Sequence, residues 1–331
     1  MILSKTPLRV SFFGGGSDYR EYFEHLPGCV IGTTINQYIY IAGVHSYNFD
    51  GIKYWISYSL NEAVCNVDDI SHPVVREVLK WMDLKEGLSL SVISNLPSRT
   101  GLGSSSSFAV GLINLLSKFK SLSLTKFDLA KRAIFVEQEL LQENVGIQDQ
   151  MHASFGGFNK FSFQGKDDFY IEPIKLSFEN MDLLNQSMYL VSTDIARYAS
   201  EAVADQTAKI KARKLDRQIE SMVALAHESQ SIFESQNNSQ MIKILGEMLN
   251  QNWQIKRQLS DKITNSVIDE LYDTMRATAP VGGKLCGAGA GGFLLMLIAR
   301  EHKKAIEKAI APRKLLPIAI EPNGSTLFEG I

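Results

Sequence analysis

The sequence PSRTGLGSSSS (residues 97–107) sets a Gly-Leu-Gly turn in front of four consecutive serines. Glycine and serine also make flexible linkers, so the composition of this stretch does not by itself define its structure. The segment before it, LSLSVISNL (88–96), has the short apolar and β-branched character of a strand. The segment after it, FAVGLINLLSKF (108–119), repeats apolar residues at helical spacing. The serines therefore lie at the start of a helix, where unpaired backbone N–H groups attract an anion such as a phosphate.

The bulk properties of the chain narrow the classes of protein that need consideration. A chain of 331 residues, 45% hydrophobic and 21% charged, is long enough for two globular domains. A formal net charge of −2 provides no basic field and argues against a nucleic-acid partner. The first residues, MILSKTPLRV, lack the pattern of a signal peptide, and apolar runs such as FLLMLIA (293–299) are too short to cross a bilayer. We expect a cytoplasmic protein with no membrane partner.

The cysteines and histidines do not form a metal or disulfide pattern. Cys29, Cys65 and Cys286 are odd in number and widely spaced, which is typical of small buried side chains in a reducing compartment. None of the six histidines is paired at the spacing of a zinc site. A magnesium ion held by oxygen ligands remains compatible with the sequence.

The order of expected elements predicts a mixed α/β protein. Strands are expected at PLRVSFF (7–13), YIYIAGV (38–44) and KYWISYS (53–59), and helices over 73–82 and 128–141. The second half has a strand at 188–195, helices between about 198 and 277, a strand at FLLMLIAR, a helix over about 301–311 and a last strand near 316–321. We place the domain boundary near residue 184, which divides the chain into 1–184 and 185–331.

A second glycine-rich stretch, RVSFFGGGSDY (9–19), follows the first expected strand. Glycines let a backbone approach a ligand, and the Asp18 carboxylate suits sugar hydroxyls as a hydrogen-bond acceptor. Alternatively, the glycines form a tight turn and Asp18 caps a short helix over YREYFEHL (19–26). The residues alone leave both interpretations open.

Acidic side chains lie among apolar neighbours in VEQELLQENVGIQDQMHASFGG (136–157). Glu137 and Glu139 fall on the expected helix, and Asp149 follows a turn at Gly146. Such carboxylates can bind a metal or accept a proton. They can equally be solvated charges, and their spacing does not decide between the two.

The stretch KLCGAGAGGFLLML (284–297) matches the GxGxxG pattern of dinucleotide-binding proteins. That pattern must follow a strand and open a helix, whereas these glycines precede a strand. We therefore expect a glycine-rich turn that packs against another loop. A P-loop is also excluded, because the chain contains no GxxxxGK[ST].

The three glycine-rich stretches, TPLRVSFFGGGSDY (6–19), PSRTGLGSSSS and KLCGAGAGGFLLML, occur in the order found in the GHMP kinases, and the chain resembles this family over almost its whole length. The resemblance implies an ATP-dependent small-molecule kinase with a ribosomal protein S5 domain 2-like N-terminal domain and a ferredoxin-like C-terminal domain. It assigns the ATP phosphates to the serine stretch, with the contributing residues Pro97, Arg99, Gly101, Leu102, Gly103, Ser104, Ser105 and Ser106.

The same resemblance implies roles for the charged residues. Ser105 and Glu137 would hold Mg²⁺, with Glu139 in reserve. Asp149, in GIQDQ (146–150), would orient the accepting hydroxyl, and Arg9 would neutralise charge beside it. An arginine partner would lower the pKa of this carboxylate, which favours a positioning role over strong general-base action. The implied substrate contacts are Gly15, Gly16, Ser17, Asp18, Asp149, Arg197, Gly287 and Gly289.

The first motif departs from the common family sequence G-E-H-T-D-Y, because this chain has GGGSDY at 14–19. In this it resembles the heptose 7-phosphate kinase branch, which implies transfer to the anomeric hydroxyl of a phosphorylated heptose. Arg197, close to Ser200, is the first candidate for the sugar phosphate, but it can equally be a surface arginine in the first turn of a helix. Lys160, Arg99 and Lys284 are weaker candidates. An unphosphorylated sugar such as fucose is the main alternative substrate. A non-catalytic sugar sensor and an oxidoreductase fit less well, because Asp149 and the serine stretch are present and the dinucleotide order is absent.

The sequence is less informative about adenine and assembly. Aromatic and apolar residues within 54–82 are expected to surround adenine. The long helices of the second half leave a homodimer open.

Overall fold

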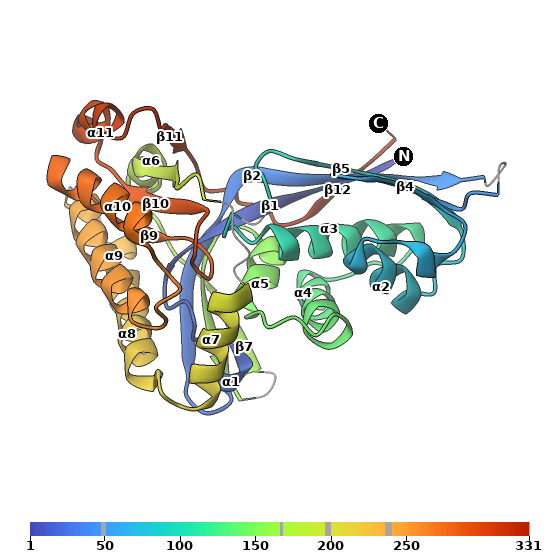
Figure 1. The fold of residues 1–331 in the computed structure, drawn as a ribbon, viewed down its shortest axis with the longest axis horizontal. Helices are drawn as coiled ribbons and strands as arrows, with labels where there is room; N and C mark the ends of the chain where they lie inside the picture. The colour runs from blue at the N-terminus through green and yellow to red at the C-terminus, as the bar shows by residue number, and fades with distance from the viewer. Residues whose placement is uncertain (48–50, 99, 166–167, 196–199, 236–239, 331) are drawn as a thin grey trace.

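The computed structural model describes residues 1–47, 51–98, 100–165, 168–195, 200–235 and 240–330 (Figure 1). Its larger part is a sheet in the order β12-β1-β2-β5-β3-β4, with β6 paired to β2 and β7 to β6. The strands are β1 (Ile2–Phe13), β2 (Gly28–Ser46), β3 (Tyr54–Ser57), β4 (Asn61–Val64), β5 (Gly87–Ser94), β6 (Phe158–Gln164), β7 (Asp168–Pro173) and β12 (Thr326–Glu329). The helices of this part are α1 (Arg20–Phe23), α2 (Pro73–Trp81), α3 (Ser104–Phe119), α4 (Lys126–Phe135) and α5 (Gln148–Phe155).

The apolar pattern of β1 explains its central place. Leu8, Val10 and Phe12 are fully buried, as the alternation in the sequence predicts. β1 pairs antiparallel with β2, and α3 packs across both strands. Gly111 allows this close packing, because a Cβ there would lie 2.6 Å from the Thr6 hydroxyl oxygen.

The smaller part is an antiparallel sheet in the order β11-β8-β10-β9. Its strands are β8 (Met188–Ser192), β9 (Gly282–Leu285), β10 (Phe293–Leu297) and β11 (Leu315–Pro317). The helices are α6 (Phe178–Ser187), α7 (Ser200–Lys211), α8 (Asp216–Glu234), α9 (Met241–Arg257), α10 (Ser266–Thr278) and α11 (Lys303–Ala309). Figure 1 shows α8 to α11 gathered at one end of the molecule, away from α2 and α4. This is the two-domain α/β architecture that the sequence predicts.

The division at residue 184 needs a correction. This residue lies inside α6, not between two elements. In addition, β12 pairs antiparallel with β1, so the end of the chain completes the first sheet and both termini lie close together (Figure 1). The edge of β1 needs a hydrogen-bonding partner, and the last strand supplies it.

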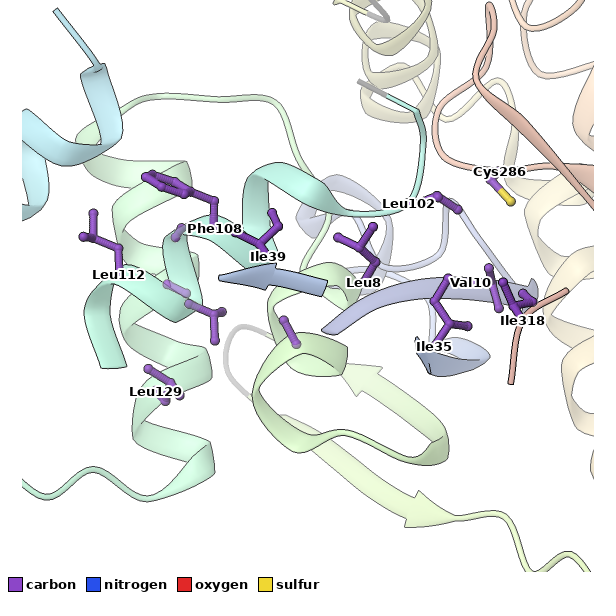
Figure 2. Packing of buried hydrophobic residues seen from close by; sticks show 14 of the residues in the cluster. Leu8, Val10, Ile35, Ile39, Leu102, Phe108, Leu112, Leu129, Cys286 and Ile318 are labelled. Atoms are coloured by element: carbon purple, nitrogen blue, oxygen red, sulfur yellow. The ribbon is translucent and has the colours of Figure 1, made fainter. Parts of the chain in front are cut away.

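Two glycine-rich stretches meet in one apolar cluster. Figure 2 shows Leu102, from the serine stretch, close to Cys286, which precedes β10. Both belong to the same buried cluster as Leu8 and Val10 of β1. This cluster therefore contains residues from both parts of the molecule and packs them together.

Among the described residues, no helix has both the length and the apolar character needed to span a membrane.

Candidate active site

The serine stretch forms the strand-to-helix connection that the sequence predicts. α3 begins at Ser104 behind Gly103, whose backbone is left-handed (φ 73°, ψ 25°), and no side chain caps the helix. The first helical bond runs from the Ser107 N–H to the Gly103 carbonyl, at 2.9 Å. The N–H groups of Ser104, Ser105 and Ser106 precede that bond and have no acceptor in the helix. They point out of a helix N-terminus, which is a favourable place for a phosphate.

The two glycines of this turn are required by close contacts. A Cβ at Gly101 would lie 2.5 Å from the Cys286 carbonyl oxygen, and one at Gly103 would lie 3.1 Å from Cγ of Arg9. Both glycines have positive φ, a conformation that L side chains rarely adopt. The turn is therefore held against β1 on one side and against the third glycine-rich stretch on the other.

The third glycine-rich stretch packs on this turn, as the sequence predicts. A Cβ at Gly287 would lie 2.5 Å from Cα of Gly101, and one at Gly292 would lie 2.3 Å from the Thr100 carbonyl oxygen. The Phe293 N–H donates to the same carbonyl at 3.2 Å. The glycines precede β10, so the dinucleotide-binding interpretation is excluded by the order of elements.

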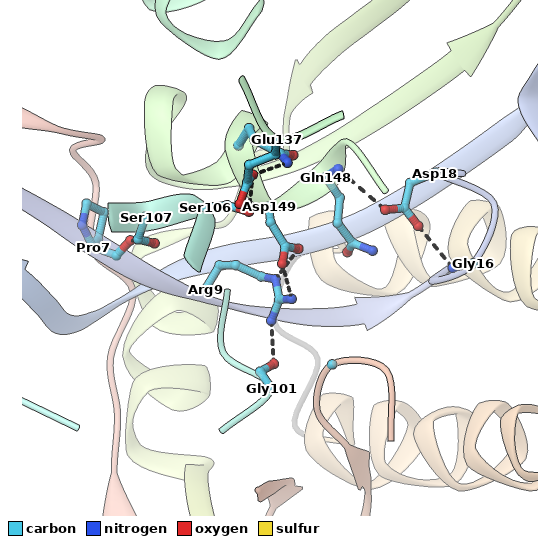
Figure 3. A network of polar contacts seen from close by, with 12 residues as sticks. Pro7, Arg9, Gly16, Asp18, Gly101, Ser106, Ser107, Glu137, Gln148 and Asp149 are labelled. Atoms are coloured by element: carbon cyan, nitrogen blue, oxygen red, sulfur yellow. Dashed lines mark hydrogen bonds and ion pairs between the residues drawn. The ribbon is translucent and has the colours of Figure 1, made fainter. Parts of the chain in front are cut away.

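Arg9 and Asp149 form a two-point ion pair at the centre of the site (Figure 3). The Arg9 side chain donates from Nε to Oδ1 at 2.7 Å and from Nη2 to Oδ2 at 2.6 Å. Its Nη1 donates to the Gly101 carbonyl at 2.6 Å, so the same guanidinium also holds the serine turn. Burial disfavours the charge of Arg9, but the Asp149 carboxylate outweighs it and raises the pKa of Arg9 above its ordinary value.

Asp18 does not cap α1, so the interpretation of Asp18 as the cap of that helix is wrong. Tyr19 precedes α1 and the helix has no side-chain cap. Asp18 instead accepts from the Gly16 N–H at 3.0 Å and the Gln148 N–H at 3.4 Å (Figure 3). Burial, and then the negative charge of Asp149, raise the pKa of Asp18.

Glu137 is fully buried, in the single π-helical turn (Val136–Leu140) that continues α4. Its Oε2 accepts from the Ser106 hydroxyl at 2.7 Å and from the Gln150 amide. Its Oε1 is buried and has no hydrogen-bond partner among the described residues. Burial raises the pKa of Glu137 to about 7. The structure therefore joins Ser106 to Glu137, whereas the family resemblance implies Ser105 as the partner of Glu137. Ser105 is exposed and lines the cavity beside Ser104.

These groups fit a magnesium ion. Mg²⁺ is usually bound by one or two carboxylates together with phosphate oxygens and water. The unpaired Oε1 of Glu137 is one such oxygen, and Ser106 joins Glu137 to the helix turn where phosphates would lie. Among the described residues, no three His, Cys, Asp or Glu side chains gather as a metal site of their own. Glu139 is at the surface, where it pairs with Arg20 at 3.2 Å.

A cavity of about 230 Å³ connects these elements. Arg9, Asp18 and Asp149 line it from the first part of the molecule, and Lys256 and Lys284 line it from the second. Lys256 was missed by sequence reasoning, because nothing near it in α9 indicates a site. Lys284 was a weak candidate for phosphate binding, and its place next to the third glycine-rich stretch was the available signal.

The remaining predicted contacts separate into three groups. Gly15, Gly16 and Gly287 line the cavity. Ser17, Leu102 and Gly289 do not line it. Ser17 is buried and donates to the Gly14 carbonyl, Leu102 lies in the core, and Gly289 packs on Ile263.

Pro97 and Lys160 lie elsewhere on the molecule. Pro97 is exposed beyond the end of β5, and Lys160 forms hydrogen bonds with Glu172 and Gln230. Arg99 and Arg197 lie outside the described residues, and the adenine site within 54–82 stays a prediction.

Comparison with known proteins identifies the class. The GHMP kinases N terminal domain matches residues 71–157, and GHMP kinases C terminal matches residues 235–314. The chain belongs to the GHMP kinase family, and it is accordingly a phosphotransferase that uses an alcohol group as acceptor.

The chain is similar to sugar kinases in both sequence and structure. The chain is 28% identical, over 93% of each sequence, to the D-glycero-alpha-D-manno-heptose 7-phosphate kinase of Campylobacter jejuni. Among solved structures, a D-glycero-D-manno-heptose 1-phosphate kinase from Bacteroides thetaiotaomicron covers the whole of both chains with a TM-score of 0.79 at 21% identity. The Lactococcus lactis galactokinase complexed with galactose gives a TM-score of 0.75 at 18% identity. The two structural matches show a shared fold.

Proposed function

We propose that this protein is an ATP-dependent sugar 1-kinase that transfers the γ-phosphate of ATP to the anomeric hydroxyl of D-glycero-D-manno-heptose 7-phosphate, giving the 1,7-bisphosphate. The observation that carries the kinase site is the Asp149 carboxylate, fixed by Arg9 in the cavity that the N-terminus of α3 also lines. The choice of sugar is supported by the similarity to the Campylobacter jejuni kinase. This proposal also implies a cytoplasmic location, where ATP and sugar phosphates are available.

The proposed reaction forms one bond and breaks one. The anomeric oxygen attacks the γ-phosphorus, the bond from that phosphorus to the β–γ bridging oxygen breaks, and ADP leaves with the electron pair. The hydroxyl proton is taken up at the Asp149 carboxylate and passes to solvent. Arg9 holds both oxygens of that carboxylate, which fixes the direction in which it faces the cavity. Its main contribution is therefore orientation of the hydroxyl, which suits phosphoryl transfer.

The nucleotide phosphates are proposed to lie at the turn of residues 101–106. The free N–H groups of the first helical turn would donate to the phosphate oxygens, and their geometry is fixed before binding. Glu137 and a hydroxyl of this turn would hold Mg²⁺, which when bound neutralises charge on the phosphates. The serine that contributes is either Ser106, already bonded to Glu137, or Ser105, which faces the cavity.

A substrate panel tests the proposal. Purified protein with Mg-ATP is assayed for ADP release with heptose 7-phosphate, the unphosphorylated heptose, mannose, fucose and galactose. We expect kcat/KM to be highest for heptose 7-phosphate, and the position of the new phosphate is read by NMR. A preference for any unphosphorylated sugar would overturn the substrate, and transfer to another hydroxyl would overturn the 1-kinase assignment.

A further inference from the structure

Lys284 is a buried lysine that forms no ion pair with any described residue. Its side chain is 2% exposed and lines the cavity, and its Nζ donates to the Phe12 carbonyl at 3.0 Å. An ammonium group has three donors. Among the described residues this one makes no second hydrogen bond and no ion pair, and the Asp18 carboxylate acts on its charge only at longer range. Burial, and then the neighbouring charge of Lys256, lower the pKa of Lys284 well below its ordinary value. A buried cation in this state is stabilised by an anion that enters the cavity.

Ser11 presents a second unused polar group at the same place. Its Oγ is buried and has no hydrogen-bond partner within the part of the chain that the structure describes. A Cβ built on Gly15 would lie 3.9 Å from that Oγ and 4.0 Å from Nζ of Lys284. The hydroxyl of Ser11 and the ammonium of Lys284 therefore converge on the space beside Gly15.

Gly15 is not required by the backbone. Unlike Gly14 and Gly16, it does not have a positive φ, and an added Cβ would meet its neighbours at ordinary van der Waals distance. A larger residue would therefore fit at position 15. Because glycine has no side chain, the space between position 15 and the Lys284 ammonium is left open. The common family motif described above carries an acidic residue at this place, and a carboxylate there would repel an anionic group.

The charges that line the cavity are unequal. Arg9, Lys256 and Lys284 are cationic, and Asp18 and Asp149 are acidic. The charge of Asp149 is taken up by Arg9. The Lys256 ammonium donates to the carbonyls of Leu285 and Gly287, so it mainly positions the third glycine-rich stretch. Lys284 keeps two of its three donors unused and, unlike Arg9, forms no ion pair with a described residue.

We propose that Lys284 and Ser11 bind the phosphate monoester that the sugar substrate already carries, and that Gly15 determines specificity for a phosphorylated sugar by leaving space for that group. The inference rests on the proposed function and assigns the phosphate end of the substrate to this position in the cavity. Asp149 then meets the accepting hydroxyl at the other end of the same sugar.

The first test replaces Lys284 by methionine, which keeps length and removes charge. We expect the KM for heptose 7-phosphate to rise about 10- to 100-fold, as for loss of a charge-assisted hydrogen bond, with the KM for ATP changed less than about twofold. Lys308→Met, at an exposed lysine of α11, is the matched control and is expected to leave both constants unchanged. A thermal melt confirms that each variant is folded.

The second test alters the space itself. Gly15→Glu would place a carboxylate beside Lys284 and is expected to remove the preference for the phosphorylated over the unphosphorylated heptose. Gly15→Ala adds a Cβ without charge and is expected to keep that preference. This pair tests the proposal even where Lys284→Met fails to fold.

The experiments distinguish a failure of the proposed function from a failure of the proposed phosphate site. If the wild-type protein does not turn over the phosphorylated sugar, the proposed function fails. If the wild type does so, but Lys284→Met leaves its KM unchanged or raises the KM for ATP instead, the proposed function stands and the phosphate position is wrong. Equal preference in Gly15→Ala and Gly15→Glu also overturns the role of Gly15.

Discussion

Replacing Glu137 by glutamine should stabilise the ligand-free protein at alkaline pH while abolishing its response to magnesium. Glu137 is fully buried, and its Oε1 has no hydrogen-bond partner among the residues described. Burial raises its pKa from 4.5 to about 7. Glutamine has the same shape and can still accept from Ser106 through its carbonyl oxygen. It removes the charge that burial disfavours.

The size and sign of the effect follow from that shift in pKa. Between pH 4.5 and about 7 the folded state binds a proton at Glu137 that the unfolded state has released. Stability contributed by the protonated carboxyl is therefore complete below pH 4.5 and is lost as the pH rises to about 7. The shift corresponds to about 3 kcal/mol of unfolding free energy. At pH 8, Glu137→Gln should be more stable than the wild type by up to about this amount.

The assay is urea unfolding of both proteins at pH 5 and pH 8, without nucleotide and then with Mg²⁺ and a non-hydrolysable ATP analogue. The difference between variant and wild type isolates Glu137, because other titrating groups contribute to both. Mg²⁺ with the analogue should raise the stability of the wild type and have little additional effect over the analogue alone in the variant. Glu139→Gln is the matched control, since Glu139 is half-exposed and pairs with Arg20, and it should show neither effect.

Two results would refute this reasoning. If Glu137→Gln is less stable than the wild type at pH 8, the carboxylate is not penalised by burial and its free oxygen has an unidentified partner. If the variant keeps full magnesium dependence while Glu139→Gln loses it, the metal is held by the other glutamate.

Three further substitutions test the centre of the site. Asp149→Asn should fold normally and lower kcat at least about 100-fold, and unchanged turnover in a single-turnover assay would remove Asp149 from the mechanism. Arg9→Lys keeps the charge and loses the two-point contact, so kcat should fall with little change in the KM for ATP; full activity would show that charge alone suffices. Gly103→Ala should destabilise the protein by about 1 kcal/mol or more and slow turnover, because the new Cβ meets Arg9. Gly165→Ala, also at positive φ but in open space, separates backbone strain from that contact, and equal losses of activity in the two variants would contradict it.

The sequence predicted those features that depend on local order along the chain. The strand, turn and helix around Gly101 and Gly103 were predicted because strand and helix periodicities flank them directly. Which serine, Ser105 or Ser106, contacts Glu137 was not predicted correctly, because this depends on the residue at which α3 begins. Moving the start of a helix by one residue turns each side chain by about 100° around the helix axis. Helix boundaries are difficult to predict from sequence to within one residue.

Features that depend on distant contacts could not be predicted. From the sequence, Asp18 could cap the helix that follows it. In the structure its carboxylate accepts a hydrogen bond from the Gln148 N–H, 130 residues away along the chain. Lys256 has the ordinary pattern of a lysine in an amphipathic helix, and only the packing of α9 on β9 buries it among the carbonyls of Leu285 and Gly287. β12 has four residues, too few for a reliable strand signal before its pairing with β1 is known.

The serine turn is held on both sides by backbone contacts, which explains why the three glycine-rich stretches form one unit. On the side of β1, the Arg9 N–H donates to the Leu102 carbonyl at 3.0 Å and the Arg9 guanidinium to the Gly101 carbonyl. On the side of β10, the Phe293 N–H donates to the Thr100 carbonyl. The N–H groups that we propose to bind the ATP phosphates are therefore already oriented in the ligand-free protein, and little reorganisation would be needed on binding. Arg9 holds both this turn and Asp149, so in the proposed reaction it would set the position of the phosphate donor relative to the accepting hydroxyl.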